Sequence, residues 1–214
     1  TWNNTSSGDD NSDTISVVTV NFSAFGGGSA VSASNSSDTW TASYAIVAGS
    51  VDGTSLNVSV TATDNAGNAT TTSDSTNATV DNVAPTVTDA KISISGASRT
   101  GGAFKIGDTV TATWDNTSSG DNNSDTISTV TVNFSAFGGG TAVSASNSSG
   151  TWTATYTIGS GSVDGTSLNG SVTATDNAGN STSTFDSTNA TVDNVAPTVT
   201  DARISISGAS GPGG

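Results

Sequence analysis

Aspartate and asparagine are the side chains of this chain whose chemistry and spacing point to a function. All 18 acidic residues are Asp, 20 further residues are Asn, and the chain contains no His and no Cys. Carboxylate and amide oxygens are the ligands that Ca²⁺ prefers, about six to eight at a time. The sequence has no histidine that could serve as the base of a nucleophile and no cysteine thiol. It also lacks a phosphate-binding glycine loop with a lysine. These residue types favour calcium binding, and we do not expect an enzyme.

The chain repeats itself at an offset of 112 residues. Residues 1–82 align without a gap to residues 113–194 with 69 of 82 positions identical, and residues 83–102 align to 195–214 with 17 of 20 identical. Such self-similarity is typical of proteins built from stacked units. We therefore expect a repeat in 1–82 that lacks its first strand and most of its second, a complete repeat in 83–194, and the first strand of a following repeat in 195–214.

Apolar side chains alternate with polar ones along most of one repeat. Trp152, Ala154, Tyr156 and Ile158 share one face of their segment, with threonines on the other. This alternation predicts half-buried strands, and we expect Trp114 and Trp152 in the core. Seven strands are expected, near 86–95, 108–114, 130–134, 141–145, 151–158, 168–174 and 182–192. Seven short strands in about 110 residues predict an all-β fold of tandem immunoglobulin-like β-sandwiches.

Three segments of the sequence carry a resemblance to a known family. VDNVAPTVT, FKIGDTVTATWDNT and VTATDNAGN resemble the tandem bacterial Ig-like extender domains of large repetitive RTX-type surface adhesins. The resemblance implies a bacterial cell-surface, extracellular protein involved in adhesion and biofilm formation, whose repeats hold a binding module away from the cell. It also implies Ca²⁺ at the domain junctions, which stiffens the chain.

The order of strands in such a sandwich places several Asp and Asn residues near each junction. The chain enters at one end of a unit and leaves at the other, so the junction at Asp81 and Asn82 should lie between Asp52 and two loops of the next repeat. Carboxylates gathered there without a cation would repel one another. The predicted calcium ligands are Asp52, Asp64, Asn65, Asn68, Asp81, Asn82, Asp115, Asn116, Asp121, Asp125, Asp164, Asp176, Asn177, Asn180, Asp193 and Asn194.

A second interpretation of these residues stays open. Asp and Asn form turns through side-chain hydrogen bonds to their own backbone, without any ion. The loop 115–125 taken alone is not an EF-hand, because it lacks the final glutamate and has a different spacing.

Charge excludes several classes of partner. The net charge is -14 with only four basic residues, which argues against nucleic acid and against anionic membrane surfaces. No apolar stretch is long enough to span a membrane.

The 14 Asn-x-Ser/Thr sequons indicate either glycosylation or simply the high content of Asn, Ser and Thr. The expected partners are neighbouring identical repeats.

The expected function is a structural extender with calcium-stiffened junctions. A first alternative is a self-assembling extracellular filament, in which residues 195–214 of one chain add a strand to the incomplete repeat of another. A further alternative is a sugar- or ice-binding module that uses threonine arrays such as Thr151, Thr153, Thr155 and Thr157.

Overall fold

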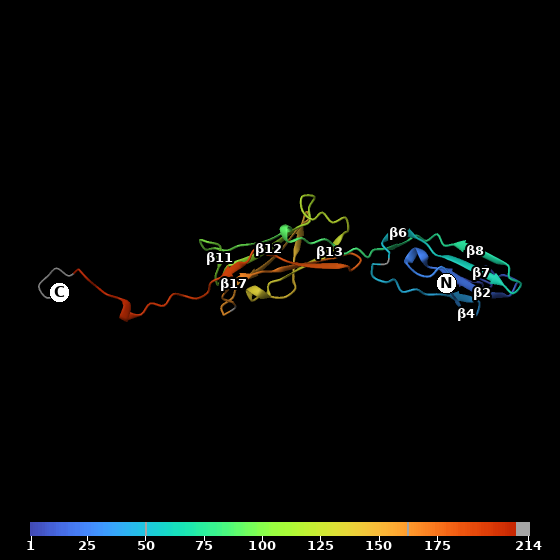
Figure 1. Ribbon diagram of the computed structural model, residues 1–214, viewed down its shortest axis with the longest axis horizontal. Coiled ribbons are helices and arrows are strands. Elements are labelled where there is room, and N and C mark those ends of the chain that lie inside the picture. Colours follow the sequence, from blue (N-terminus) through green and yellow to red (C-terminus); the bar gives the residue numbers. More distant parts are fainter. Residues whose placement is uncertain (50, 162, 209–214) are drawn as a thin grey trace. The chain divides into compact units, whose positions relative to one another are not determined.

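The computed structural model describes residues 1–49, 51–161 and 163–208, and these form β-strands joined by turns (Figure 1). Contacts divide the chain into two compact units, each described here by itself. Unit 1 consists of Thr1–Ala84 with Ala178–Asn180, and unit 2 of Pro85–Asn177 with Ser181–Gly214.

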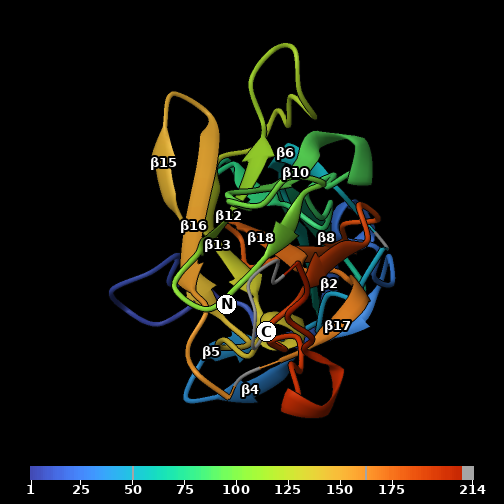
Figure 2. The same cartoon turned by 90° about the vertical axis from the view of Figure 1, so that its left-hand side faces the viewer.

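Unit 2 is a β-sandwich of antiparallel sheets. One sheet has the order β10-β12-β16-β15, formed by Ile92–Ser95, Thr109–Asp115, Thr151–Thr157 and Ser146–Ser148. These strands can be followed across the sheet in Figure 2. The facing sheet has the order β14-β13-β18-β19, formed by Val143–Ser144, Ile127–Asn133, Ser171–Asp176 and Ser181–Phe185. The prediction of an all-β sandwich is confirmed.

A third, smaller sheet closes one side of unit 2. It has the order β11-β20-β17, formed by Ala103–Phe104, Ala190–Val192 and Gly165–Leu168. Here β11 runs parallel to β20, whereas β17 is antiparallel to it. The short helical turn η3, Ser135–Phe137, follows β13 and ends at Gly138, whose φ of 84° suits a glycine.

The core of unit 2 lies between its sheets and consists of alternate strand residues. Trp114 is 1 % and Trp152 is 8 % exposed, as the alternation predicts. Val110 and Ala112 of β12 are fully buried beside them. Phe137 fills the side near β11, with its ring 6.0 Å from that of Phe104 in an edge-to-face contact.

The structure corrects three of the predicted strands. The strand expected over 86–95 begins at Ile92, because the helical turn η2, Asp89–Lys91, interrupts it. The strand expected over 168–174 divides into β17 and β18, and that over 182–192 divides into β19 and β20. Each pair crosses from one sheet to another, and a polar/apolar alternation does not mark such a crossing.

Unit 1 uses the same pairings with fewer strands. One sheet has the order β3-β2-β7-β8, formed by Val31–Ser32, Ile15–Asn21, Ser59–Asp64 and Ala69–Ser73. The others are β1-β5-β4, formed by Trp2–Asn3, Thr39–Thr41 and Ser34–Ser36, and the pair β6-β9, formed by Gly53–Leu56 and Ala78–Val80. The turn η1, Ser23–Phe25, corresponds to η3, and the turn η4, Asp201–Arg203, lies in the tail after unit 2's last strand.

The two units allow a matched test of core packing. Phe137 is fully buried, whereas its counterpart Phe25 is only half-buried, because unit 1 contains no counterpart of Phe104. We expect Phe137→Ala to lower the free energy of unfolding of unit 2 by about 3–5 kcal/mol, and Phe25→Ala to cost unit 1 clearly less. Guanidinium unfolding followed by residue-resolved NMR separates the two units, and equal losses in both would contradict the packing described here.

Candidate functional site

The loop between β12 and β13 is folded by its own aspartates. Asp115 Oδ1 accepts a 2.8 Å hydrogen bond from the Thr117 amide, and the Asp121 amide donates to Asp115 O over 3.0 Å. Gly120 is required at this point, because a Cβ there would lie 2.2 Å from Asp115 O. The sequence thus brings the Asp121 side chain back to the end of β12.

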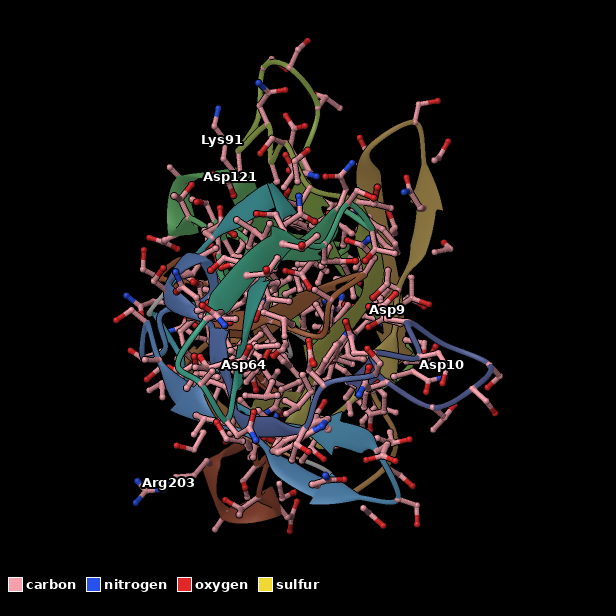
Figure 3. The ribbon with its side chains drawn as sticks, turned by 90° about the vertical axis from the view of Figure 1, so that its right-hand side faces the viewer. Asp9, Asp10, Asp64, Lys91, Asp121 and Arg203 are labelled. Atoms are coloured by element: carbon pink, nitrogen blue, oxygen red, sulfur yellow. The ribbon has the colours of Figure 1, made fainter. Side chains whose placement is uncertain are left out.

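Asp121 joins three donors from two segments that are distant in sequence. Its Oδ2 accepts from the indole Nε1 of Trp114 over 2.7 Å and from the amide of Thr88 over 2.9 Å. Its Oδ1 accepts from the Thr88 hydroxyl over 2.6 Å. Asp121 and its counterpart in unit 1, Asp9, are labelled in Figure 3. One carboxylate therefore ties the segment before β10 to a core tryptophan.

Asn123 binds the same segment two residues earlier. The Thr86 amide donates to Asn123 Oδ1 over 2.6 Å, and Asn123 Nδ2 donates to Thr86 O over 2.9 Å. Asn116 Oδ1 accepts from both the amide and Nδ2 of Asn123, at 2.9 and 2.7 Å, and so orients its side chain. Thr86 is held as a strand residue would be, but by a side-chain amide.

The far side of this segment is held by the chain around β19. Asp89 accepts from the amide of Ser187 over 2.8 Å and from its hydroxyl over 2.5 Å. The hydroxyl of Thr184 donates to Val87 O over 2.6 Å. Residues 86–89, which we call the strap, are therefore bound both by the loop after β12 and by the chain at and just after β19.

Other predicted residues lie in the hairpin turns. Asp64 accepts from the amides of Ala66 and Asn68 and from Asn68 Nδ2, all within 2.9 Å. Bonds from the side chain and then the amide of Asn68 lower the pKa of Asp64 below its ordinary value of 3.8. The neighbouring Asn65 amide donates to Thr14 O.

The corresponding turn after β18 is more buried. Asp176 is 1 % exposed, and the amide of Asn177 donates to Thr126 O over 3.0 Å. Asn180, which groups with unit 1, has its Nδ2 3.1 Å from Asp81 O and 3.3 Å from Asp81 Oδ1.

The last predicted residues fix the point at which the chain leaves each unit. The Asn82 amide donates to Asp52 Oδ1 over 3.1 Å, and Asn194 donates to Asp164 Oδ1 over 2.8 Å in the same way. Asp81 and Asp193 each accept from the amide two residues later, at 3.2 and 3.3 Å: Val83 and Val195. Asp125 lies half-buried at the end of the loop that precedes β13.

The predicted ligands are thus divided among the polar loop, the hairpin turns and the exits. Within the described ranges, no three acidic side chains form a group that could hold a metal ion. The sequence did not identify Asn123, Asp89 or Thr88 as site residues. The polar residues of the TVTD segment, 86–89, and the Asn content of the loop 115–125 are the signals that could have pointed to them.

No protein-family model matches the chain, and no curated protein is significantly similar to it. In the part of the chain that the structure describes, no helix has the length and apolar character needed to cross a membrane.

From the hydrogen bonds that hold the strap, we expect a specific effect of removing the Asp121 carboxylate. Asp121→Ala should lower the free energy of unfolding of unit 2 by about 1–3 kcal/mol, because it leaves the Trp114 indole and the Thr88 amide without their acceptor. Amide hydrogen exchange at Thr88 should accelerate as well.

Asp9→Ala is the matched control for this variant. Asp9 accepts from the Trp2 indole over 2.6 Å and lies in unit 1, whereas the strap belongs to unit 2. The Asp9→Ala variant should therefore leave amide exchange in residues 86–89 unchanged. Unaltered Thr88 exchange in Asp121→Ala would contradict the role given to this carboxylate.

Acid should weaken unit 2 through Asp108 and Asp115. The side chain of Ser98 and then its amide lower the pKa of Asp108, and the side chain and amide of Thr117 lower that of Asp115, in both cases below the ordinary 3.8. Because the folded pKa is lowered, the stabilisation is complete above this ordinary value and is lost as the pH falls below it. Thermal unfolding between pH 6 and pH 2 should show this loss, and Asp108→Asn should reduce it. The exposed Asp10→Asn serves as control, and the same pH profile in all three proteins would refute the assignment.

Proposed function

We propose that this chain is a spacer segment of a long extracellular bacterial adhesin. Its tandem Ig-like β-sandwich units add length and hold another part of the protein away from the cell surface. The role is mechanical and involves no catalysis. The internal repeat and the resemblance to extender domains support this proposal, and the confirmed sandwich fold is the one that such domains require.

The observation that carries the proposal is the shortness of the free linker. Asn82 is bound to unit 1, since its amide donates to Asp52 and its Nδ2 donates to Val51 O over 2.7 Å. Thr86 is bound to unit 2 through Asn123. Only residues 83–85 lie between these two anchors, and one of them is Pro85, whose ring fixes its φ. A linker this short and stiff limits the bending of the chain.

The exit from unit 2 repeats the exit from unit 1. Asn194 donates through its amide to Asp164 and through its Nδ2 to Val163 O over 2.6 Å, and the residues that follow repeat residues 83–90. Each unit therefore releases the chain in the same way, which is what an array of regular spacing needs.

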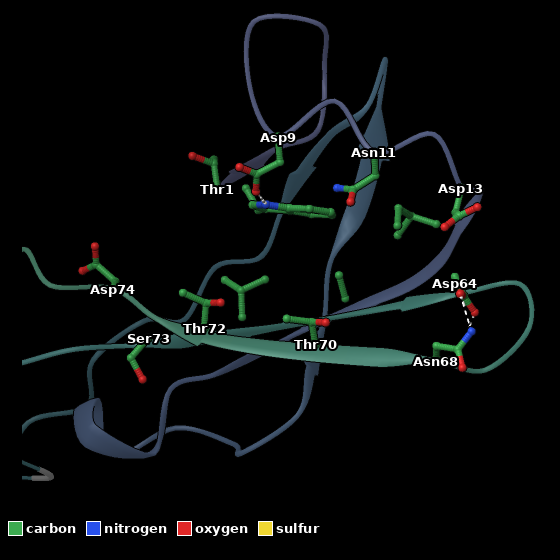
Figure 4. Close-up of a pocket in the computed structure, with 14 residues that line it drawn as sticks. Thr1, Asp9, Asn11, Asp13, Asp64, Asn68, Thr70, Thr72, Ser73 and Asp74 are labelled. Atoms are coloured by element: carbon green, nitrogen blue, oxygen red, sulfur yellow. Dashed lines mark hydrogen bonds between the residues drawn. The ribbon is translucent and has the colours of Figure 1, made fainter.

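Calcium is a separate part of this proposal. It rests on the Asp and Asn content and on the resemblance. The bound strap supports a spacer without any ion, and Ca²⁺ would add stiffness to it. Donors of the protein itself already bind the carboxylates of Asp64 (Figure 4), Asp115 and Asp121, the first two in turns and the third at the strap.

Scattering from arrays of complete repeats tests the spacer. We expect the maximum dimension of chains with two, three and four copies of residues 83–194 to grow linearly, by about 40–45 Å per copy. Growth with roughly the square root of the copy number would indicate flexible linkers and would contradict the proposal.

Thermal unfolding of the two-copy chain tests the calcium part separately. A bound ion raises the melting temperature with rising ion concentration, because it binds only the folded state. We expect a higher melting temperature in calcium chloride than in EDTA. Identical melting in both would remove calcium from the proposal and leave the spacer in place.

A further inference from the structure

One pair of strands in unit 2 joins an early part of its chain to the last strand before the exit. β11 runs parallel to β20, with Phe104 opposite Val192. All other strand pairs in the described part of the chain are antiparallel. Because β11 and β20 run the same way, the start of β11 and the end of β20 lie at opposite ends of the pair. A pull between these two points therefore acts along the strands and slides one past the other.

The side chain of Asn194 lengthens this pair beyond the strands themselves. The amide of Asp193 donates to Phe104 O over 2.8 Å, and the amide of Ile106 donates to Asn194 Oδ1 over 2.7 Å. Here a side-chain carbonyl takes the place of a backbone carbonyl. The amide and Nδ2 of the same Asn194 bind Asp164 and Val163, so its side chain is fixed while it accepts from β11's end.

Both strands are also fixed in the core of unit 2. Phe104 is 2 % and Val192 is 1 % exposed, and both belong to the buried cluster between the sheets. The ring of Phe104 packs against that of Phe137. β11 cannot slide along β20 without withdrawing Phe104 from this packing, so hydrogen bonds and apolar contacts resist the same movement.

Tension on a spacer enters unit 2 at the strap and leaves it after Asn194. The strap is followed by β10, which pairs with β12 and not with β20. Residues 96–102 contain no strand, so β11 is the next paired element once tension has detached the strap and β10. A pair pulled along its length must break its hydrogen bonds together, whereas a pair opened from one end breaks them one after another.

We propose that β11, β20 and the side chain of Asn194 form a mechanical clamp, which resists extension of unit 2. This load-bearing function rests on the proposed spacer, because the clamp acts only in a chain that is under tension. It gives Asn194 a role beyond fixing the exit: the residue connects the point at which the chain leaves to the strand that is loaded from the entry side.

Force spectroscopy of the 214-residue chain tests the clamp through the direction of pulling. The chain contains no Cys, so introduced cysteines attach the handles at chosen positions. Thr100→Cys with Val195→Cys pulls β11 along β20, whereas Ile106→Cys with Val195→Cys opens the pair from the end toward which both strands run. All three positions are exposed.

We expect the first arrangement to need an unfolding force at least about twofold higher at the same loading rate, because at least two hydrogen bonds then share the load. Forced unfolding depends on the rate of unfolding and not on equilibrium stability, so the comparison separates a clamp from general stability. Equal forces in the two directions would overturn the proposal.

Asn194→Ala provides the second measurement. It removes the acceptor of the Ile106 amide, so it should lower the force along the strands more than the force that opens the pair. Asn147→Ala is the matched control: its Oδ1 accepts from the Gly150 amide over 2.9 Å in the hairpin between β15 and β16, and its loss should leave both forces unchanged. Val130→Ala, a core change at a 2 % exposed residue of β13, should lower thermal stability and keep the ratio of the two forces.

An unchanged ratio in Asn194→Ala would overturn the role given to this side chain. The comparison of directions uses chains with Asn194 intact, so it remains decisive even if that variant does not fold. Failure of the clamp leaves the spacer in place, because scattering from repeat arrays tests the spacer without applied force. Scattering that showed flexible linkers would instead remove the spacer, and with it the tension on which the clamp's function rests.

Discussion

The arrangement of unit 2 depends on one half-buried carboxylate that satisfies three donors. Asp121 accepts from the indole of Trp114 and from the amide and hydroxyl of Thr88. The indole belongs to the core, whereas Thr88 belongs to the segment that arrives from the preceding unit. Because hydrogen bonds to a charged acceptor are about twice as strong as neutral ones, this contact fixes the incoming chain more firmly than an ordinary turn would. Together with the bonds between Asn123 and Thr86, it reduces a linker that would otherwise include residues 83–91 to three residues.

The comparison of the two units shows what the strap contributes to the core. Both carry Trp, Asp and Asn at matching positions, yet Trp2 is half-buried where Trp114 is 1 % exposed. The difference lies in the strands and the strap that cover this side of unit 2. The strap is therefore part of the sandwich as well as part of the connection, and linker order and unit stability depend on the same contacts.

The sequence predicted the fold class and the core tryptophans because period-two alternation reports directly on burial. It did not predict the division of residues 168–174 and 182–192 into two strands each, since a crossing between sheets leaves the alternation unchanged. The loop 115–125 was singled out for ion binding, which stays a prediction, and the structure adds that Asp121 and Asn123 of this loop bind the strap. Two of the four donors to Asp121 and Asn123 are the backbone amides of Thr86 and Thr88, and such amides are present in every residue except proline, so the sequence could not identify the strap as their partner.

Backbone ¹⁵N relaxation of residues 83–91 in calcium-free buffer tests the central claim most directly. If the side chains of unit 2 hold the strap, the amides of Val87 and Thr88 will have order parameters near 0.85, like those of β12, and any lower values will be confined to Val83 and Ala84. Order parameters below about 0.6 at Val87 and Thr88 would show a mobile connection and would contradict the account.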